Sequence, residues 1–347
     1  MKAIVKERAE RGFVYKDVPV PRPGDSDVLI KVKAAAICGT ELYAYVWNDW
    51  AARTYRNIPL IFGHECSGEV VEVGTAVRNI AVGDRVAVET HIPCTKCYHC
   101  RSGMQHLCPS MRLFGVTVNG CFAEHALVPS VSVRKIPAAL SWQDGALLEP
   151  LGVALRAATE CNALGETVGI VGCGSIGQMA ISLFKLMGAR QVIASDVSAF
   201  KLEQAQAAGA DVVIDASKGN AAEAVLSATD GLGVGIAVEL SGSATGINAA
   251  FDSLRKGGLI FIIGQPKEPV TIDVSRNIVV KEATVKGFHG REMFRTWEIA
   301  ESIISSKKID LGRIITHRFP LSRFEEAFEV LRKGDALKVM FLPEQGA

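Results

Sequence analysis

The chain has 347 residues, 48% of them hydrophobic, which is enough to fill the cores of about two domains. Its 38 lysines and arginines nearly balance 37 aspartates and glutamates, and no run of about 18 apolar residues is present, so neither nucleic acid nor a membrane is an expected partner. Nine cysteines, an odd number, argue against a secreted disulfide framework, and we expect a cytoplasmic globular protein that acts on a small molecule.

The first 150 residues or so predict a β-barrel-like domain. Short β-rich runs, such as 28–32 and 68–74, alternate with turns of glycine, proline and aspartate. Regular helical periodicity becomes the dominant pattern only after this region. The change of texture near residue 150 therefore indicates a domain boundary.

Four residues of the first domain have the chemistry of an open catalytic zinc site: Cys38, His64, Glu65 and Glu149. Such sites use cysteine, histidine and carboxylate ligands and keep one position for water or a substrate oxygen. Taken singly, each residue also has an ordinary structural interpretation. Cys38 suits a buried apolar position, His64 a turn, and the glutamates a solvated surface. Their combination with the two motifs that follow favours the metal site.

A run of four cysteines with the spacing C-x2-C-x2-C-x7-C is the strongest signal in the chain. Its members are Cys94, Cys97, Cys100 and Cys108, in a stretch bounded by Pro93 and Pro109. Zinc takes four thiolates in a tetrahedron, and two-residue spacers let a tight turn direct successive sulfurs to one point. Chance occurrence or disulfide pairing is the alternative. A closed shell of four sulfurs leaves no position for substrate, so we expect a structural zinc ion here.

From residue 167 onward, strands alternate with helices. A helix is expected over 176–187, ended by Gly188, and strands over 167–171, 191–195, 212–214, 236–239, 259–263 and 284–286. This alternation predicts an α/β fold with a doubly wound parallel sheet. The pattern lapses after about residue 288, and we expect the tail to return to the first domain.

The segment Gly172-Cys173-Gly174-Ser175-Ile176-Gly177 follows the first of these strands and opens the helix. In a G-x-G-x-x-G turn the glycines permit a tight turn, close approach of a pyrophosphate, and helix–strand packing. Asp196 ends the next strand nineteen residues after Gly177, where a carboxylate accepts hydrogen bonds from ribose hydroxyls and repels a 2′-phosphate. NAD is therefore favoured over NADP, and Lys201 is a candidate second ribose contact.

Taken together, these motifs resemble the zinc-dependent medium-chain dehydrogenases over essentially the whole chain. The likeness rests on I-C-G-T at 37–40, G-H-E at 63–65, V-G-D-R-V at 82–86, the cysteine loop and the glycine turn. It implies a GroES-like β-barrel catalytic domain over 1–153 and 290–347, a Rossmann NAD-binding domain over 154–289, and a homotetramer. It also implies two zinc ions per chain, one catalytic and one structural.

Two groups within that family compete as the nearest resemblance. Trp47 and the stretches 116–124, 290–297 and 315–319 resemble members that oxidise L-threonine to 2-amino-3-ketobutyrate. The segment 145–151, which contains Glu149, resembles sorbitol and other polyol dehydrogenases. We expect oxidation of a secondary alcohol, with threonine as the favoured substrate and a polyol such as sorbitol, xylitol or a butanediol as the alternative. A non-catalytic NAD-binding sensor is a remote third interpretation.

The resemblance also implies roles for single residues near the open zinc site. Cys38, His64 and Glu65 would bind the metal or lie next to it. Thr40 would accept the alcohol proton, and Glu149 would be either an exchangeable ligand or a proton relay. The remaining expected contacts are Tyr43 in the relay, Trp47 and His91 near the substrate, and Ile176, Ile263, Gly264, Gln265, Phe288 and His289 near the cofactor.

Tyr43 departs from the resemblance, because the family often has a relay histidine at this position. A phenol with an ordinary pKa near 10 orients a water molecule but is a poor base at neutral pH. The proton therefore has two alternative exits, through Glu149 or through a chain of water molecules. His91 is as compatible with no role at all as with a role in specificity.

Overall fold

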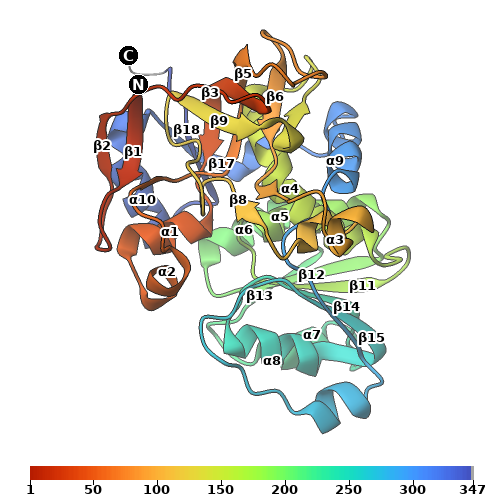
Figure 1. Ribbon diagram of the computed structural model, residues 1–347. Coiled ribbons are helices and arrows are strands. Elements are labelled where there is room, and N and C mark those ends of the chain that lie inside the picture. Colours follow the sequence, from red (N-terminus) through yellow and green to blue (C-terminus); the bar gives the residue numbers. More distant parts are fainter. Residues whose placement is uncertain (345–347) are drawn as a thin grey trace. The chain divides into compact units, whose positions relative to one another are not determined.

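The computed structural model describes residues 1–344, and the chain divides into two compact units (Figure 1). The first unit combines residues 1–150 with the chain from Glu292 onward, and the second is Leu151–Arg291. Among the described residues, none of the helices has the length and apolar character needed to cross a membrane.

The first unit is built from sheets that are antiparallel except where β17 pairs in parallel with β18, and its C-terminal segment supplies these two strands. A three-stranded sheet has the order β2-β1-β4, a larger sheet the order β10-β6-β5-β3-β18-β17 with β9 also on β3, and β7 pairs with β8. Strand β18 pairs antiparallel with β3 through Met340 and Ala36. The strands are β1 (Lys2–Lys6), β2 (Val14–Asp17), β3 (Asp27–Ala36), β4 (Leu60–Ile61), β5 (Glu65–Val73), β6 (Arg85–Val88), β7 (His91–Ile92), β8 (Arg112–Leu113), β9 (His125–Pro129), β10 (Val133–Lys135), β17 (Ile315–Phe319) and β18 (Lys338–Phe341).

The helices of this unit are short, apart from α4, which continues past the limit of the unit. Helix α4 contains Pro150, which removes one backbone donor from its interior. The helices are α1 (Gly39–Val46), α2 (Asp49–Thr54), α3 (Tyr98–Arg101), α4 (Trp142–Thr159), α9 (Arg295–Ser305) and α10 (Phe324–Lys333), with 3-10 turns η1 (Gln105–Leu107), η2 (Ser130–Ser132), η4 (Leu311–Ile314) and η5 (Leu321–Arg323).

The second unit is a six-stranded parallel sheet with the order β13-β12-β11-β14-β15-β16. Its central strands are buried runs of apolar residues, as expected for a sheet covered on both faces. The strands are β11 (Thr167–Val171), β12 (Gln191–Asp196), β13 (Val212–Asp215), β14 (Val234–Glu239), β15 (Leu254–Ile262) and β16 (Thr284–Gly287), and the helices are α5 (Ser175–Leu186), α6 (Ala199–Ala207), α7 (Ala221–Ser227), α8 (Ala244–Ser253) and the π-helix η3 (Ser275–Val279).

This sheet confirms the expected doubly wound α/β fold. The strand order reverses between β11 and β14, which makes the carboxyl ends of these strands the place where such folds bind ligands. The strand limits that differ most from expectation are those of β15, which begins at Leu254 and not at residue 259. Its first half contains Lys256, Gly257 and Gly258, a sequence typical of a turn, and the ladder with β14 shifts register at this end.

Candidate active site

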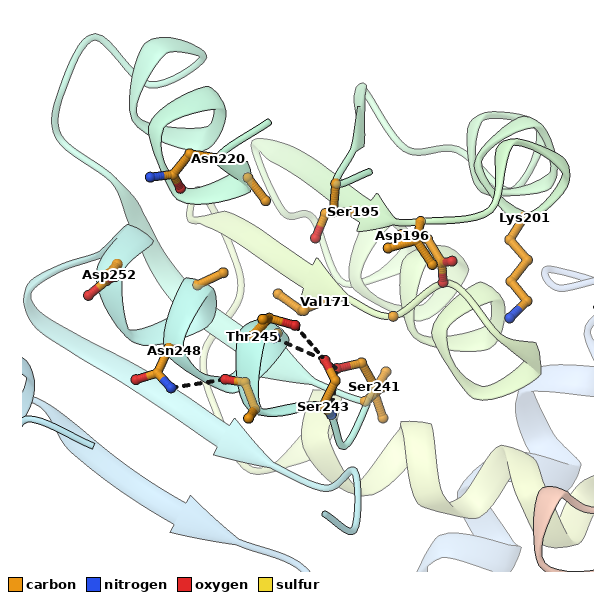
Figure 2. Close-up of a pocket in the computed structure, with 18 of the residues that line it drawn as sticks. Val171, Ser195, Asp196, Lys201, Asn220, Ser241, Ser243, Thr245, Asn248 and Asp252 are labelled. Atoms are coloured by element: carbon orange, nitrogen blue, oxygen red, sulfur yellow. Dashed lines mark hydrogen bonds between the residues drawn. The ribbon is translucent and has the colours of Figure 1, made fainter. Parts of the chain in front are cut away.

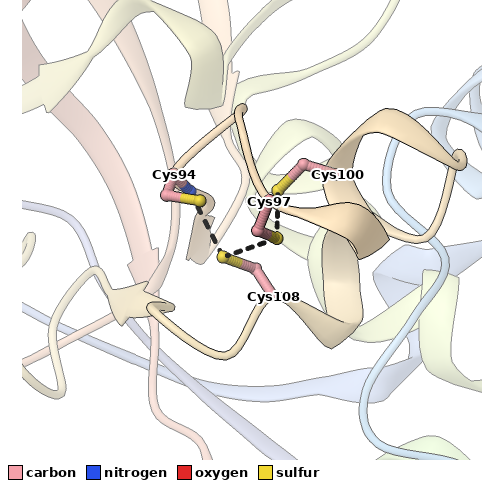
Figure 3. A group of neighbouring side chains, drawn as sticks. All are labelled: Cys94, Cys97, Cys100 and Cys108. Carbon is pink, nitrogen blue, oxygen red and sulfur yellow. Dashed lines mark hydrogen bonds between the residues drawn. The ribbon is translucent and has the colours of Figure 1, made fainter.

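The four cysteines of residues 94–108 converge on one point (Figure 3). Their sulfur atoms all lie within 4.8 Å of one another, with Cys97 Sγ 3.5 Å from that of Cys100 and 3.9 Å from that of Cys108. These separations are too long for disulfides and close to the ~3.8 Å expected between sulfurs bound tetrahedrally at about 2.3 Å from zinc. The arrangement fits a closed four-thiolate zinc site.

The loop around these cysteines already favours thiolate at one of them. Backbone N–H groups of Lys96 and Cys97 lower the pKa of the Cys94 thiol to about 6. Burial has the opposite effect on Cys100 and raises its pKa to about 12. Four thiolates at these separations repel one another, and a bound metal cation offsets this repulsion, because coordination deprotonates thiols outright.

A second cluster brings together Cys38, His64 and Glu65, whose ligand atoms also lie within 4.8 Å of one another. Cys38 precedes helix α1, His64 precedes strand β5, and Glu65 begins that strand. All three side chains come from the first unit, and His64 and Glu65 are buried. Because the protein supplies a thiol, an imidazole and a carboxylate, this donor set fits a zinc site with a position left for another ligand.

Glu41 orients His64 within this cluster. Its carboxylate accepts a hydrogen bond from the Cys38 backbone N–H at 2.8 Å, and its Oε1 lies 2.5 Å from His64 Nδ1. Burial, the largest single influence, opposes protonation of the imidazole, but the charges and hydrogen bonds of Glu41 and Cys38 together outweigh it and raise the pKa of His64. A carboxylate behind one ring nitrogen directs the other nitrogen towards a metal. Sequence analysis gave Glu41 no role, although its position three residues after Cys38 at the start of a helix was a signal for capping.

Lys338 was also missed, because it lies 273 residues from its partner in the sequence. Its ammonium group is 2.5 Å from both carboxylate oxygens of Glu65 and donates to the Ile37 carbonyl at 3.2 Å. Burial raises the pKa of Glu65 to about 7, against the opposing effect of Lys338, and neighbouring Glu149 adds to the rise. The C-terminal segment thus supplies the counter-charge of the metal cluster.

Glu149 lies next to the three-residue cluster but outside it. Its Oε1 accepts a hydrogen bond from Thr90 Oγ1 at 2.6 Å, and Thr90 also reaches the His64 carbonyl at 3.4 Å. Thr40 Oγ1 is buried, and none of the described side chains or backbone groups hydrogen-bonds to it. A buried hydroxyl without a partner is costly, so a polar substrate atom is the natural complement for Thr40.

The expected substrate and relay residues have firm structural contacts of their own. Tyr43 packs edge-on against Trp50 at 5.5 Å between ring centroids. Trp47 ends helix α1 in a left-handed conformation, with the Lys6 ammonium 4.5 Å from its ring. His91 is buried, and its Nδ1 lies 2.7 Å from Glu89. These contacts leave the substrate roles of Tyr43, Trp47 and His91 as predictions.

The glycine turn after β11 has the shape that a pyrophosphate site needs. Gly172 has φ of +98°, and a side chain there would meet the backbone of Ser241 at 2.7 Å. Gly177 packs so closely that a Cβ would lie 2.1 Å from the Gly172 carbonyl oxygen. By contrast, a Cβ on Gly174 would meet no described atom within 4 Å, which leaves open space at the amino end of helix α5.

A pocket of about 880 Å³ lies along the carboxyl ends of β11 to β14 (Figure 2). Gly172, Gly174, Asp196 and Lys201 line it, with Asp196 and Lys201 on one side of the view. Asp196 accepts hydrogen bonds from the Cys173 N–H at 2.8 Å and the Ser198 N–H at 2.9 Å. Each carboxylate oxygen keeps a further lone pair for a ribose hydroxyl.

The other expected cofactor residues lie outside the lining of this pocket. Ile176 is in helix α5 beside Gly177, and Ile263, Gly264 and Gln265 follow strand β15. Phe288 is buried, stacks on Phe261 at 5.1 Å, and carries the Arg156 guanidinium 4.4 Å from its ring. His289, the next residue, is exposed. The side chain of Phe288 thus has a packing role, and cofactor contacts by these residues remain predictions.

Comparison with known proteins places this geometry in a family. Residues 24–138 match the alcohol dehydrogenase GroES-like domain, and residues 175–306 match the zinc-binding dehydrogenase model. The chain is 40% identical over 343 residues to L-threonine 3-dehydrogenase of Bacillus licheniformis, covering 99% of both chains. It is also 40% identical to L-threonine 3-dehydrogenase of Thermococcus kodakarensis, over 100% of this chain and 99% of that one.

Solved structures agree with these sequence matches. The 2R,3R-butanediol dehydrogenase of Bacillus subtilis superposes with a TM-score of 0.89 at 29% identity, covering 99% of each chain. The matched models and the full-length relatives cover both units of the fold. The chain therefore belongs to the zinc-binding alcohol dehydrogenase family, and it is an oxidoreductase that uses zinc and a nicotinamide dinucleotide.

Proposed function

We propose that the protein oxidises L-threonine at carbon three, with NAD as the hydride acceptor, to give 2-amino-3-ketobutyrate. The observation that carries this proposal is the likeness to L-threonine 3-dehydrogenases at about 40% identity from end to end. The cluster of Cys38, His64 and Glu65, with the pocket at Asp196, supports it with the required chemistry.

Two zinc ions per chain are part of the proposal. Cys94, Cys97, Cys100 and Cys108 would hold a structural ion, and Cys38, His64 and Glu65 a catalytic one. A bound zinc ion lowers the pKa of an alcohol, and oxidised nicotinamide takes up a hydride. The structural ion has no open position for these steps.

The side chains around the open cluster would orient the alcohol and receive its proton. Thr40 Oγ1 would accept the hydrogen bond of the substrate hydroxyl, because it is buried without a partner among the described residues. The Tyr55 hydroxyl holds the Thr40 carbonyl at 3.2 Å and so fixes this turn of α1. Glu149, fixed by Thr90, would carry the proton onward. Tyr43 would orient the substrate or a water molecule and is the poorer base.

Selection of NAD over NADP would depend on Asp196. Its carboxylate repels a 2′-phosphate, and the residues that follow it, Val197 to Ala199, include no arginine to accept one. Lys201 lines the same pocket and would bind the adenosine ribose. Ile176, Ile263, Gly264, Gln265, Phe288 and His289 complete the proposed cofactor contacts.

A substrate panel tests the proposed activity directly. Purified protein with zinc and NAD should form NADH with L-threonine, measured by its absorbance, and the product should be the ketone at carbon three. Sorbitol, xylitol and 2,3-butanediol should give a kcat/KM at least tenfold lower. A tenfold preference in the opposite direction would refute the threonine proposal and leave the zinc and NAD sites untouched.

A polyol substrate is the second candidate, because of the structural match to 2R,3R-butanediol dehydrogenase. Tyr43 supplies a phenol three residues after Thr40 in the sequence, and a neutral hydrogen-bonding group suits a diol better than an ammonium and a carboxylate. The sequence likeness is weaker, at 29% against 40% for the threonine enzymes. We therefore rank diol oxidation as a secondary activity.

We also propose that the protein is a cytoplasmic homotetramer with the domain limits expected from sequence, 1–153, 154–289 and 290–347. Strand β16 is the last strand of the parallel sheet, so one of its edges is available for pairing. Val274, Val279, Val280 and Val285 are 40–66% exposed on and beside this strand. Size-exclusion chromatography with light scattering would test the oligomeric state.

A further inference from the structure

Glu239 is a fully buried carboxylate for which sequence analysis had no role. It ends strand β14, and its oxygens accept hydrogen bonds from the Ser241 N–H at 2.8 Å, the Gly242 N–H at 3.0 Å and the Ser241 hydroxyl. Burial raises its pKa, whereas these three donors lower it by stabilising the ionised form. The net pKa direction is upward, and all three hydrogen-bond donors that the side chain accepts from are neutral.

Buried carboxylates normally face a cation, and Glu239 does not. Within residues 1–344, no lysine, arginine or histidine forms an ion pair with it, and the donors that its oxygens accept from are uncharged groups of Ser241 and Gly242. Glu65, which is also fully buried, has the Lys338 ammonium at 2.5 Å. An uncompensated buried charge is expensive for a fold, so it is retained more readily where a ligand supplies the opposite charge.

The position of Glu239 in the fold indicates which ligand would supply the positive charge. The residue after it donates to the Val171 carbonyl at 2.8 Å, beside the glycine turn that begins at Gly172. The backbone carbonyl of Glu239 accepts hydrogen bonds from Ile263 and Gly264 at 3.0 Å, and a Cβ on Gly264 would lie 2.8 Å from Glu239 Oε2. Glu239 therefore lies at the centre of three loops at the carboxyl edge of the sheet.

A dinucleotide crosses this edge at the point where the strand order reverses. If Asp196 binds the adenosine ribose on the β12 side, a dinucleotide that crosses the reversal point would direct its nicotinamide half towards β14 and β15. The two redox forms of the cofactor differ at that half by one positive charge on the ring. A fixed anion beneath the loops after β14 and β15 therefore distinguishes them electrostatically.

We propose that Glu239 is a specificity-determining residue for the redox state of the cofactor: its carboxylate favours the cationic ring of NAD+ over the neutral ring of NADH. The bias promotes binding of the oxidant and release of the reduced product. It acts in the direction of alcohol oxidation. The inference requires NAD binding but not a particular alcohol, so failure of the threonine proposal leaves it standing.

The test is the ratio of two dissociation constants in the zinc-loaded full chain. NADH binding is followed by its fluorescence and NAD+ binding by calorimetry, for the unmodified protein and for Glu239→Gln. Gln keeps an acceptor oxygen for the Ser241 and Gly242 N–H groups and removes only the charge. We expect the preference for NAD+ relative to NADH to fall on the order of tenfold, because the variant loses one charge–charge attraction in the protein.

Two controls separate charge from structure. Glu203→Gln removes an exposed carboxylate of helix α6 that is outside the lining of the pocket, and it should leave the ratio unchanged. Glu239→Ala should lower the preference for NAD+ over NADH as Glu239→Gln does. Added formate should restore this preference by supplying an anion to the space that the side chain leaves. If the Gln or the Ala variant binds NAD+ and NADH more weakly by the same factor, or binds both as tightly as the unmodified protein, Glu239 has only a structural role. The inference is then wrong.

Discussion

The four-cysteine loop and the cluster of Cys38, His64 and Glu65 hold their side chains in opposite ways. The loop supplies all its sulfurs from residues 94–108, and backbone N–H groups are the main cause of the lowered pKa of the Cys94 thiol. The open cluster draws on two separate segments and depends on charged neighbours, with Glu41 behind His64 and Lys338 beside Glu65. A structural site can be encoded locally, whereas a site that must change its ligands needs long-range electrostatic support.

The largest expected effect separates the two sites by substitution. His64→Ala should reduce kcat/KM at least about 10³-fold and remove one zinc per chain, because the open site loses a ligand. Cys97→Ser should instead lower folding yield and shift the melting temperature down by about 10 °C, because zinc binding at a closed site is coupled to folding. Elemental analysis and calorimetry measure both. Full activity with one zinc per chain would contradict the two-site arrangement.

The support of the open cluster by Lys338 is the next difference to test. Lys338→Met leaves the Glu65 carboxylate buried without its counter-charge, which should destabilise the fold by about 3–5 kcal/mol in urea unfolding. Lys135→Met is the matched control, because Lys135 pairs with Asp84 at 2.7 Å on the surface and is half exposed. That variant should cost no more than about 1 kcal/mol. Equal effects of the two substitutions would show that the buried pair has no special importance.

Thr40 tests whether the open cluster has a substrate-facing hydroxyl that the closed loop lacks. Thr40→Ala should lower kcat about 10²-fold and leave the NAD dissociation constant unchanged, because the hydroxyl acts on the alcohol proton. Thr40→Ser keeps the oxygen and should retain most of the activity. Steady-state kinetics with NAD titration distinguish these outcomes, and an equal loss in the Ser variant would assign Thr40 to packing.

Asp196 extends the comparison to the second unit. Its carboxylate binds two backbone N–H groups of the fold and is also the proposed contact to the cofactor ribose. Asp196→Ala should reduce the preference for NAD over NADP by about 1–3 kcal/mol, the usual size for a hydrogen bond to a charged group. Loss of its bonds to the Cys173 and Ser198 N–H groups affects both cofactors alike, so the ratio of kcat/KM values isolates the ribose contribution. An unchanged ratio would show that selection lies elsewhere.

The parts of this molecule that follow from nearby residues were predictable from sequence. The parallel sheet was expected from the alternation of strands and helices, and strands such as β11 have the expected limits, because hydrophobic period and glycine stops are local signals. The geometry at Lys338 and Thr90 was not predictable, since each contacts a carboxylate far away in the sequence. Glu239 also escaped notice, because a glutamate at a strand end suggests exposure until the fold buries it.

The smallest expected effect concerns Lys6, which stabilises the end of the helix that carries Thr40. Its buried ammonium donates to the Ala44 carbonyl at 2.7 Å and the Gly12 carbonyl at 3.0 Å, and it lies 4.5 Å from the Trp47 ring. Burial lowers the pKa of Lys6 to about 8, below the ordinary value of 10.5 that applies to the unfolded chain. Unlike Lys338, it has carbonyl oxygens and aromatic faces as its main partners.

The sign of the pH effect follows from this difference in pKa. Between pH 8 and 10.5 the unfolded chain binds more protons at Lys6 than the folded chain does, so this residue makes the free energy of unfolding rise with pH, on the order of 1 kcal/mol. Lys6→Met keeps the apolar stem and removes the titration, so urea unfolding of the variant should show a flatter pH dependence over this window. Parallel curves for the two proteins would mean that Lys6 keeps its proton in the fold up to pH 10.5, and that its carbonyl partners compensate fully for its burial.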